Sequence, residues 1–436
     1  MLTKKAKIAL LTSLNLILIL IVNGIRLVDG NLINPNKNIC SCQTELLWNY
    51  TMGDSGKGLA ITPDGKYLAV GSWDRNLYFF DTSNPNPLWN KTLPDLVDQV
   101  EISADGDYIV ASDGASTLYL FYKSNSTPIW NFTAGNHIRC ISLTPDAKYI
   151  AAGSWDGNLY LFDRLSAIPI WNYTFGNRVY HVDISSDGNI IVAGGVNVGV
   201  HVFNMSKATP LVWVNDSMST VYGMDLSVNG QDLVVGTLTG TSGTIFLYNI
   251  LSSDPIQKFE TTETFGHVSI TSDGKYFVGA VSFEYRCYLF EKGKEKPVWN
   301  FTAGNQIEDV KISSDGNFIC FGSYDHNFYL FNRPNIYANL EKKEMLCQKS
   351  FQTGDIVYSV ESSENGEKMA TISNDNQVYM FVNEISENQQ ESPSISFGNF
   401  FLIALLGGIA IILINTRIRH KSLKNNDQIR STFTSD

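Results

Sequence analysis

The sequence is poor in the residues that carry metal, redox and nucleophilic chemistry. It has six cysteines and six histidines in 436 residues, and the histidines form no HxH or HExxH pattern. A metal site needs clustered His, Cys, Asp or Glu side chains, so no metal ligands are predicted. The GxSxG turn that commonly presents a catalytic serine is also missing. We therefore predict no catalytic residue, no cofactor and a protein that is not an enzyme.

Basic residues are scarce as well. Lys and Arg total 32 against 43 Asp and Glu, which gives a net charge of −11, and nine of the basic residues lie in the end segments 1–30 and 416–436. A protein that neutralises phosphates needs the opposite sign, so nucleic acid is not a predicted partner. Hydrophobic residues make up 44% of the chain, which is ample material for a folded core.

Long apolar runs are limited to two. Residues 8–22 follow three lysines, which is typical of a signal-peptide core or signal anchor, and cleavage of this segment is left open. Residues 397–414 are long enough to span a bilayer, and the basic stretch NTRIRHKSLK after them predicts a cytoplasmic C-terminus. We predict, in chain order, a signal peptide or anchor, a juxtamembrane segment, a translocated domain, a stalk linker, a transmembrane helix and a cytoplasmic tail. Their bounds are 1–30, 31–45, 46–383, 384–396, 397–415 and 416–436. The protein is thus expected in the cell membrane, with the domain outside the cell.

The middle of the chain repeats itself. IAAGSWDGNLYLFD at 150–163 has counterparts in LAVGSWDRNLYFFD at 68–81 and ICFGSYDHNFYLFN at 319–332. A turn dipeptide of the Asp-Gly kind occurs once per unit, starting at 64, 105, 146, 187, 229, 273, 315 and 365. Each unit contains four short, apolar or aromatic stretches, which indicate four β-strands. Four strands repeated eight times predict an all-β, eight-bladed β-propeller.

The ends of the repeat predict how the ring closes. The first strand, LLWNYT at 46–51, is of the outermost type and has no earlier partner in its own unit. The last unit ends at 378–383 with the third type of strand and lacks an outer one. The first strand should therefore complete the last blade in a 3+1 closure.

The unit resembles the tryptophan-aspartate (WD) repeat propellers over 46–383. The turn TPDG at 62–65 and the GSxDxxL stretches match that family. The resemblance implies that one aspartate per matching unit bonds backbone groups and fixes a tight turn; these are Asp74, Asp156, Asp325 and Asp375. The third strand ends in Phe-Asp or Phe-Asn instead of Trp-Asp, and tryptophan stands on the outer strand, as in quinoprotein-like propellers.

An extracellular propeller enzyme, quinoprotein-like or metal-dependent and working in the central channel, is the alternative function. By resemblance, a quinone-dependent enzyme would also have adjacent cysteines, but Cys40 and Cys42 precede the first blade. His181, His267 and Asp309 share one repeat position, which we interpret as part of a polar rim. A carboxylate pair in the channel would favour the enzyme, whereas a plain channel under an aromatic and charged rim would favour binding.

Three cysteines, Cys140, Cys287 and Cys320, lie inside strand patterns and are predicted to be buried thiols. A disulfide from Cys347 to Cys40 or Cys42 is left open. Five Asn-x-Thr sequons share one position on the predicted outer strand, where glycans would be sterically allowed. These glycosylation candidates are Asn49, Asn90, Asn131, Asn172 and Asn300.

Binding residues are expected where the repeat varies. The connections between units and the turns between second and third strands should share one face, and their variable positions are rich in aromatic residues and arginine. The candidates are Trp73, Arg75, Arg139, Trp155, Tyr180, Tyr222, Phe283, Tyr324 and Tyr358. For Trp73, Trp155 and Tyr324 an inter-blade packing role remains equally open. We predict a membrane-anchored scaffold that binds a protein or glycan ligand through this face.

Overall fold

The computed structural model describes residues 26–28, 31–33, 42–218, 220–239, 242–333 and 347–385. The chain divides into a compact unit, Cys42–Ile385, and a second unit of the remaining residues. Of the second unit, two short antiparallel strands are described, β1 (Arg26–Val28) and β2 (Asn31–Ile33). Within the described ranges, no helix has the length and apolarity that a membrane crossing requires. The predicted signal or anchor core and the helix at 397–415 lie outside these ranges and stay predictions.

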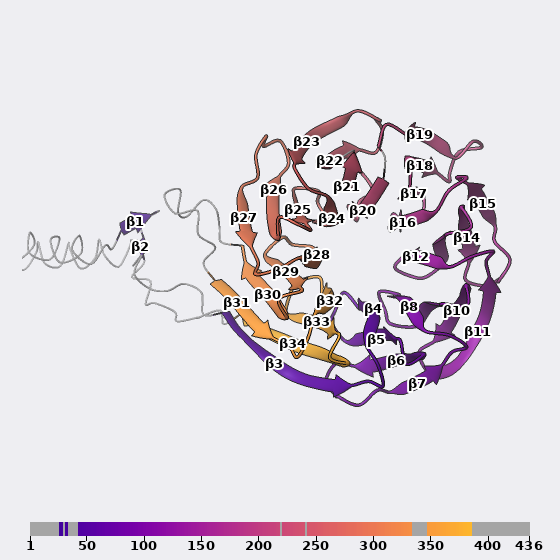
Figure 1. Ribbon diagram of the computed structural model, residues 1–436, viewed down its shortest axis with the longest axis horizontal. Helices are drawn as coiled ribbons and strands as arrows, with labels where there is room; N and C mark the ends of the chain where they lie inside the picture. The colour runs from indigo at the N-terminus through magenta and orange to yellow at the C-terminus, as the bar shows by residue number, and fades with distance from the viewer. Residues whose placement is uncertain are drawn as a thin grey trace, which may run out of the picture. The chain divides into compact units, whose positions relative to one another are not determined.

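The compact unit is an eight-bladed β-propeller, which confirms the predicted fold. Eight four-stranded antiparallel sheets surround a central axis, and in each the strands follow chain order from the inside to the outside (Figure 1). Blade 8 is the exception, because its outer strand comes from the N-terminal end of the unit.

The first four blades are continuous in sequence. Blade 1 contains β4 (Gly56–Ile61), β5 (Tyr67–Ser72), β6 (Asn76–Asp81) and β7 (Trp89–Thr92). Blade 2 contains β8 (Val97–Ile102), β9 (Tyr108–Asp113), β10 (Thr117–Tyr122) and β11 (Asn125–Thr133). Blade 3 contains β12 (Ile138–Leu143), β13 (Tyr149–Ser154), β14 (Asn158–Asp163) and β15 (Trp171–Thr174). Blade 4 contains β16 (Val179–Ile184), β17 (Ile190–Gly195), β18 (Gly199–Asn204) and β19 (Leu211–Asn215).

The last four blades complete the ring. Blade 5 contains β20 (Thr220–Leu226), β21 (Asp232–Thr239), β22 (Ser242–Asn249) and β23 (Pro255–Thr261). Blade 6 contains β24 (Phe265–Ile270), β25 (Tyr276–Val281), β26 (Arg286–Glu291) and β27 (Trp299–Thr302). Blade 7 contains β28 (Ile307–Ile312), β29 (Phe318–Ser323), β30 (Asn327–Asn332) and β31 (Cys347–Gln352). Blade 8 contains β32 (Val357–Ser362), β33 (Lys368–Ser373), β34 (Gln377–Ile385) and β3 (Cys42–Thr51).

The predicted 3+1 closure is confirmed by the pairing of β3 with β34. Their antiparallel register runs from Cys42 opposite Ile385 to Thr51 opposite Gln377. Both ends of the propeller therefore lie at the same end of one strand pair.

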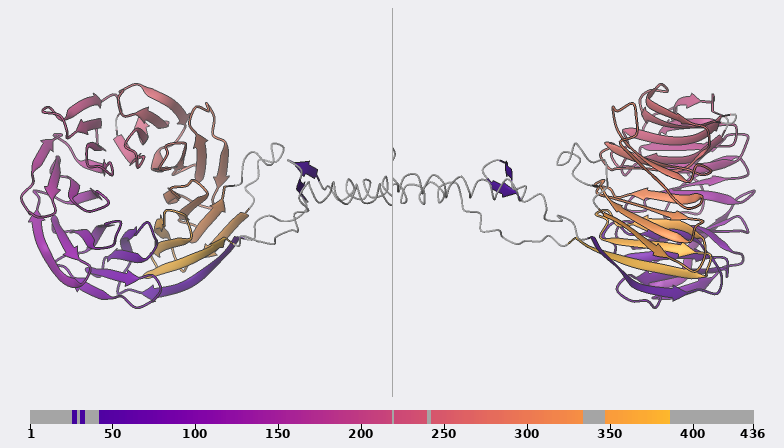
Figure 2. Two further views of the ribbon diagram at one scale, coloured as in Figure 1. Left: turned by 180° about the vertical axis from the view of Figure 1, so that it is seen from behind. Right: turned by 60° about the vertical axis from the view of Figure 1, so that its left-hand side comes forward.

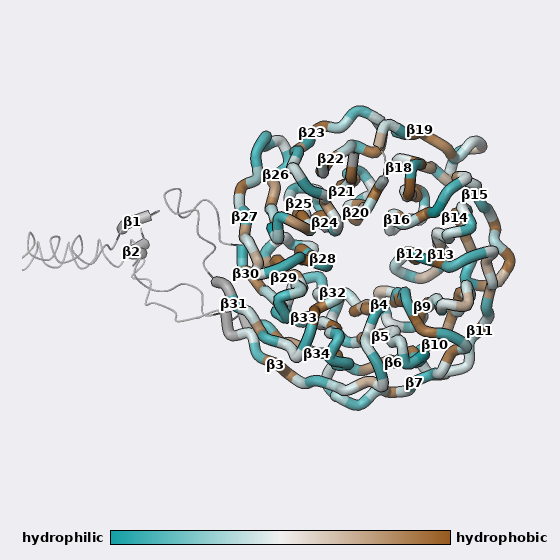
Figure 3. Tube along the Cα trace, in the orientation of Figure 1, coloured by the Kyte–Doolittle hydropathy of each residue, from teal (hydrophilic) through white to brown (hydrophobic). Residues whose placement is uncertain are grey.

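The core lies between the blades rather than at the axis. Eight separate clusters of buried hydrophobic residues each join two neighbouring blades, including blades 8 and 1. Figure 3 accordingly shows hydrophobic positions spread through all blades. The predicted buried thiols belong to this core, since Cys140, Cys287 and Cys320 are free and buried. Cys347 and Cys42 begin β31 and β3, and their pairing stays a prediction.

The turn between the first two strands of every blade needs a left-handed residue. Seven blades place glycine there, for example Gly65 at φ 67°. Blade 3 has Ala147 at φ 51°, a conformation that costs an L-residue about 1 kcal/mol. The eight predicted turn dipeptides thus all lie at their expected place.

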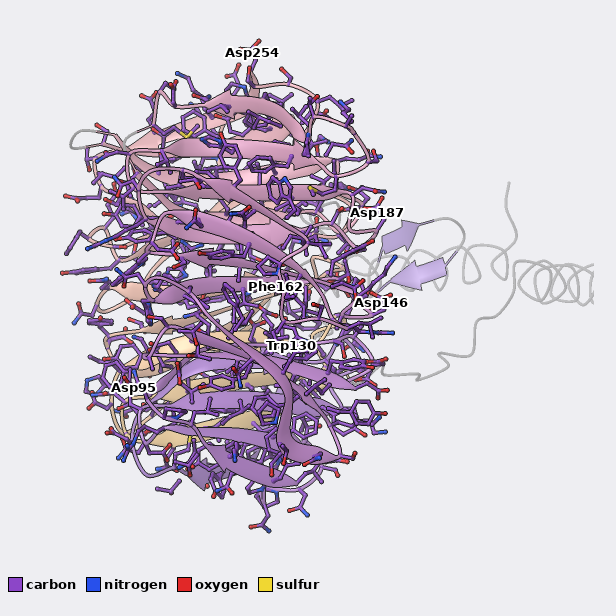
Figure 4. All side chains as sticks on the ribbon, turned by 90° about the vertical axis from the view of Figure 1, so that its right-hand side faces the viewer. Asp95, Trp130, Asp146, Phe162, Asp187 and Asp254 are labelled. Carbon is purple, nitrogen blue, oxygen red and sulfur yellow. The ribbon has the colours of Figure 1, made fainter. Side chains whose placement is uncertain are left out.

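The propeller is a thick ring with two different faces (Figure 2). Asp95, in the connection from β7 to β8, lies at one face, and Asp146 and Asp187, in turns between first and second strands, lie at the other (Figure 4). We call the first the connection face.

Candidate binding face at the mouth of the central channel

The two predicted loop sets do share the connection face. In blade 3, for example, the backbone N–H of Trp155 in the β13–β14 turn donates to the carbonyl of His137 in the β11–β12 connection at 2.8 Å. The same backbone bond joins Trp73 to Ser55 at 2.9 Å. These backbone hydrogen bonds therefore bring the variable side chains of the two loop sets together.

A β-bulge explains why one position of each inner strand is available at this face. In all eight blades the register between the inner and second strands shifts near the start of the inner strand, where the ladder skips one residue, or two in blade 6. A bulged residue leaves the ladder and turns its side chain away from the sheet. These bulge residues are Lys57, Asp98, Arg139, Tyr180, Tyr222, Gly266, Glu308 and Tyr358.

Two cavities open among them. The first, which we call the mouth pocket, has a volume of about 410 Å³ and extends from blade 3 to blade 7. Five of the predicted binding residues line it: Arg139, Trp155, Tyr180, Tyr222 and Phe283. The second, the channel, has a volume of about 300 Å³ and is lined by the inner strands around the ring. Arg139, Tyr180 and Tyr358 line the channel as well.

Gly266 determines where the mouth pocket lies. At the bulge position the other seven blades carry a charged or aromatic side chain, whereas blade 6 has none. The pocket opens beside this gap and is bounded by Phe283, whose side chain is 65% exposed. An aromatic ring this exposed is a common feature of recognition surfaces.

The remaining predicted residues lie outside the mouth pocket. Trp73 is 38% exposed and lies 5.4 Å from the Lys57 ammonium. Burial and the nearby Glu308 raise the pKa of Tyr324. Arg75 is exposed and lines neither cavity. Its backbone adopts a left-handed conformation in the β5–β6 turn, with φ 70°, and its carbonyl accepts the N–H of Leu93.

The charged bulge residues differ in whether they have partners. The Lys57 ammonium lies 4.1 Å above the Tyr358 ring, and Asp98 Oδ2 lies 2.6 Å from His137 Nε2. Glu308 accepts a hydrogen bond from Gln306 at 3.4 Å, and burial raises the pKa of Glu308. The Arg139 guanidinium makes no hydrogen bond, ion pair or ring contact within the described part of the chain.

The channel wall carries a second ring of polar residues that the sequence reasoning missed. It lies three residues after the bulge position of the inner strands and includes Glu101, Asp183, Asp225, Lys311 and Glu361. In the stretches VEI, VDI, MDL and VKI a charged residue stands between two apolar residues. This pattern was the sequence signal that could have indicated the polar ring. Lys311 Nζ lies 2.9 Å from Glu361 Oε1. The wall of the channel is therefore lined with charged residues.

Most of these carboxylates join neighbouring blades. Asp183 Oδ2 accepts the backbone N–H of Leu226 at 2.9 Å, and Asp225 Oδ2 accepts that of Ile270 at 2.8 Å. Burial raises the pKa of both carboxyls. A buried carboxylate that satisfies the free N–H of the next inner strand is a structural link.

Glu101 has a different environment. It has no hydrogen-bond partner among the described residues, and burial together with the Glu361 carboxylate raises its pKa to about 8. Glu101 is a channel carboxyl whose protonation changes near neutral pH, as is Asp225, whose pKa burial raises to about 7.

The histidine position noted in the sequence lies at the top of the channel. His267 Nδ1 is 3.3 Å from Asp309 Oδ1, and Asp309 Oδ2 accepts the N–H of Val360 at 3.0 Å. Burial and the nearby His267 lower the pKa of His181 to about 3, so its ring is neutral. Among the described residues no group of three or more His, Cys, Asp or Glu side chains is arranged to hold a metal ion.

The turn aspartates tie each connection to the blade that follows it. Asp156 Oδ2 accepts the N–H of Gly135 at 2.9 Å and the Tyr160 hydroxyl at 2.8 Å. Asp74, Asp325 and Asp375 accept the equivalent backbone bonds from Gly53, Gly304 and Gly354. These hydrogen bonds hold each of these connections in a fixed position relative to the β-turn of the following blade.

The outer strands carry the sequons on their exposed side. Asn49, Asn90, Asn131, Asn172 and Asn300 are all exposed. In β11 exposed and half-buried residues alternate, so that Ile129, Asn131 and Thr133 face outward while Trp130 faces the blade. The glycosylation candidates are accessible from the rim of the ring.

Three segments of the chain match the family model "WD domain, G-beta repeat", at residues 55–81, 126–163 and 295–332. No curated protein matches the chain. Among solved structures, one titled "Structure of Dos1 propeller" is similar in fold, with a TM-score of 0.66 and 13% sequence identity. The match covers 82% of this chain and 97% of that one. Three segments of the chain are thus similar to WD repeats, and the likeness to the solved propeller agrees with the fold described above.

Proposed function

We propose that this protein is a non-enzymatic scaffold that binds a protein partner at the mouth pocket. The observation that carries the proposal is the arc of Trp155, Tyr180, Tyr222 and Phe283 around one cavity of about 410 Å³. Aromatic side chains in a cleft are the usual anchors of an interface, because they bury much apolar area with little loss of side-chain entropy. The cavity has the size of a site for one or two side chains of a partner.

The proposal includes the location predicted from the sequence. The propeller would face outside the cell, held by the helix at 397–415, with the sequons of its outer strands glycosylated. The exposure of Asn49, Asn90, Asn131, Asn172 and Asn300 supports this. The glycan ligand that the sequence also allows stays a prediction.

The charged channel favours one alternative, an enzyme that uses the channel for acid–base chemistry. Its best candidate is Glu101, whose raised pKa of about 8 suits proton transfer near neutral pH. The scaffold ranks first because Asp183, Asp225 and Asp309 are engaged by backbone groups of the next blade, as a frame requires.

Crosslinking on intact cells tests the scaffold. The full-length protein is compared with a variant carrying Tyr222→Ala and Phe283→Ala, which truncates two exposed aromatic residues of the pocket. The matched control carries Leu165→Ala and Leu251→Ala, which removes two residues that are 85% and 82% exposed outside the pocket. We expect crosslinked proteins to be retained by the control and lost from the pocket variant. Equal crosslinking by both variants would exclude the mouth pocket as the binding site.

A further inference from the structure

The mouth pocket has an uneven distribution of charge. On the side of blades 3 and 4 it is bordered by Arg139, and Arg178 lies with its guanidinium carbon 4.8 Å from the Trp155 ring. On the far side, in blade 7, it is bordered by Glu308. Aromatic residues lie between the two ends.

The positive end has no counter-charge in the described part of the chain. Asp98, the next bulge residue beside Arg139, pairs with His137 at 2.6 Å. Arg178 contacts Trp155 but forms no ion pair with a described residue. The neighbouring His181 is neutral because its pKa is lowered. A half-buried guanidinium retains strong affinity for a planar anion, since it can form two parallel hydrogen bonds to a carboxylate.

Two further features indicate an acceptor-bearing ligand. The buried indole nitrogen of Trp155 has no acceptor among the described residues, although this side chain lines the pocket. The negative end is already engaged, because Glu308 accepts a hydrogen bond from Gln306. The pocket therefore has unused donors at one end and an aromatic wall beside them.

We propose that the mouth pocket binds an acidic segment of a partner protein, with a carboxylate on Arg139 and an adjacent aromatic side chain against Tyr180, Tyr222 and Phe283. The inference rests on the proposed function and names the chemistry of the partner. The acidity of the chain as a whole works against such a partner, so the specificity comes from the local arginines.

The test uses saturation-transfer NMR on the full-length protein in detergent. Three peptides serve as probes: Ac-Gly-Glu-Phe-Glu-Gly-NH₂, the same peptide with glutamine in place of glutamate, and the same peptide with lysine. We expect the acidic peptide to give the strongest signal on its aromatic protons. Arg139→Gln should weaken that signal at least about fivefold, since a guanidinium–carboxylate pair is a strong contact.

Two further variants separate the pocket from the general surface. Gly266→Leu fills the pocket without changing charge; an added Cβ would meet Ser282 Oγ at 3.0 Å, a small side-chain atom. This variant should also abolish the signal. Lys207→Gln removes an exposed positive charge outside both cavities and should leave the signal unchanged.

The inference is wrong if the neutral or basic peptide binds as well as the acidic one, if none binds, or if Arg139→Gln has no effect. Its failure is distinguishable from that of the proposed function. Crosslinking that depends on Tyr222 and Phe283 but not on Arg139 would keep the scaffold and reject the acidic partner.

Discussion

At the scale of single residues, Glu101 has an environment that opposes its charge. Its carboxyl faces the channel near Glu361, no described residue donates a hydrogen bond to it, and the Lys311 charge offsets only part of the effect of burial and of Glu361. Its pKa in the folded protein, about 8, lies above the ordinary value of 4.5. Stability associated with the protonated form is complete below pH 4.5 and is lost as the pH rises through 8.

This predicts that Glu101→Gln stabilises the protein at alkaline pH. Glutamine resembles the protonated carboxyl, so both proteins should have similar melting temperatures near pH 4.5. The variant should become progressively more stable than wild type up to about pH 8 and keep a constant advantage above it. Thermal unfolding of the full-length protein across this pH range measures the difference.

Glu367→Gln is the matched control, because Glu367 is exposed in a turn. Its difference from wild type should not vary with pH over the same range. A pH-independent difference for Glu101→Gln as well would show that Glu101 ionises normally in the folded protein.

At the scale of elements, the outer strands join neighbouring blades through one repeated contact. Trp130 Nε1 donates to the carbonyl of Arg164 in the next blade at 2.8 Å, and its ring stacks on Phe162 at 5.6 Å (Figure 4). Trp48 and Trp89 make the equivalent bonds at 2.7 Å. In blade 5 the Gln257 amide donates to the next blade as well, to the carbonyl of Lys294 at 2.5 Å and to that of Glu291 at 3.5 Å. The tryptophan of the repeat is therefore an inter-blade donor.

Trp130→Phe should destabilise the propeller by about 1–2 kcal/mol, because it keeps a ring against Phe162 and leaves the Arg164 carbonyl without its donor. Trp130→Ala should lose the packing too and cost about 3–5 kcal/mol. Urea unfolding of the full-length variants measures both. Equal losses for the two substitutions would mean that the hydrogen bond contributes everything and the ring nothing, contrary to this account.

The elements were largely predictable from the sequence, whereas the channel was not. Turn dipeptides, the spacing of tryptophan and the type of the first and last strands determined blade number and closure. The repeat also places Arg139, Tyr180 and Tyr222 at one position, and these side chains line one pocket, although their role in binding stays a prediction. The channel residues Glu101 and Lys311 were missed because their stretches read as ordinary half-buried strands. These residues lie close together only because the eight inner strands converge on the central axis. A local sequence pattern does not indicate that convergence.

At the scale of the whole molecule, the exposed outer strands predict a glycosylated rim. Enzymatic deglycosylation of the full-length protein from eukaryotic cells should lower its apparent mass. Replacing Asn90 by Gln should remove one glycan, and the same result is expected at the four equivalent positions. Asn86→Gln serves as the control, because Asn86 is exposed in the same blade but precedes proline and forms no sequon. Unmodified asparagines at all five positions would contradict an outward-facing propeller.

The 3+1 closure also has a mechanical consequence. The two ends of the propeller leave from the pair Cys42 and Ile385, at one end of the antiparallel ladder between β3 and β34. Tension that separates these ends loads the ladder one pair at a time, like a zipper, instead of shearing all its bonds together. The ring therefore opens at blade 8 under a modest force. In every other blade the four strands are consecutive in the sequence, so that no chain end lies within the sheet.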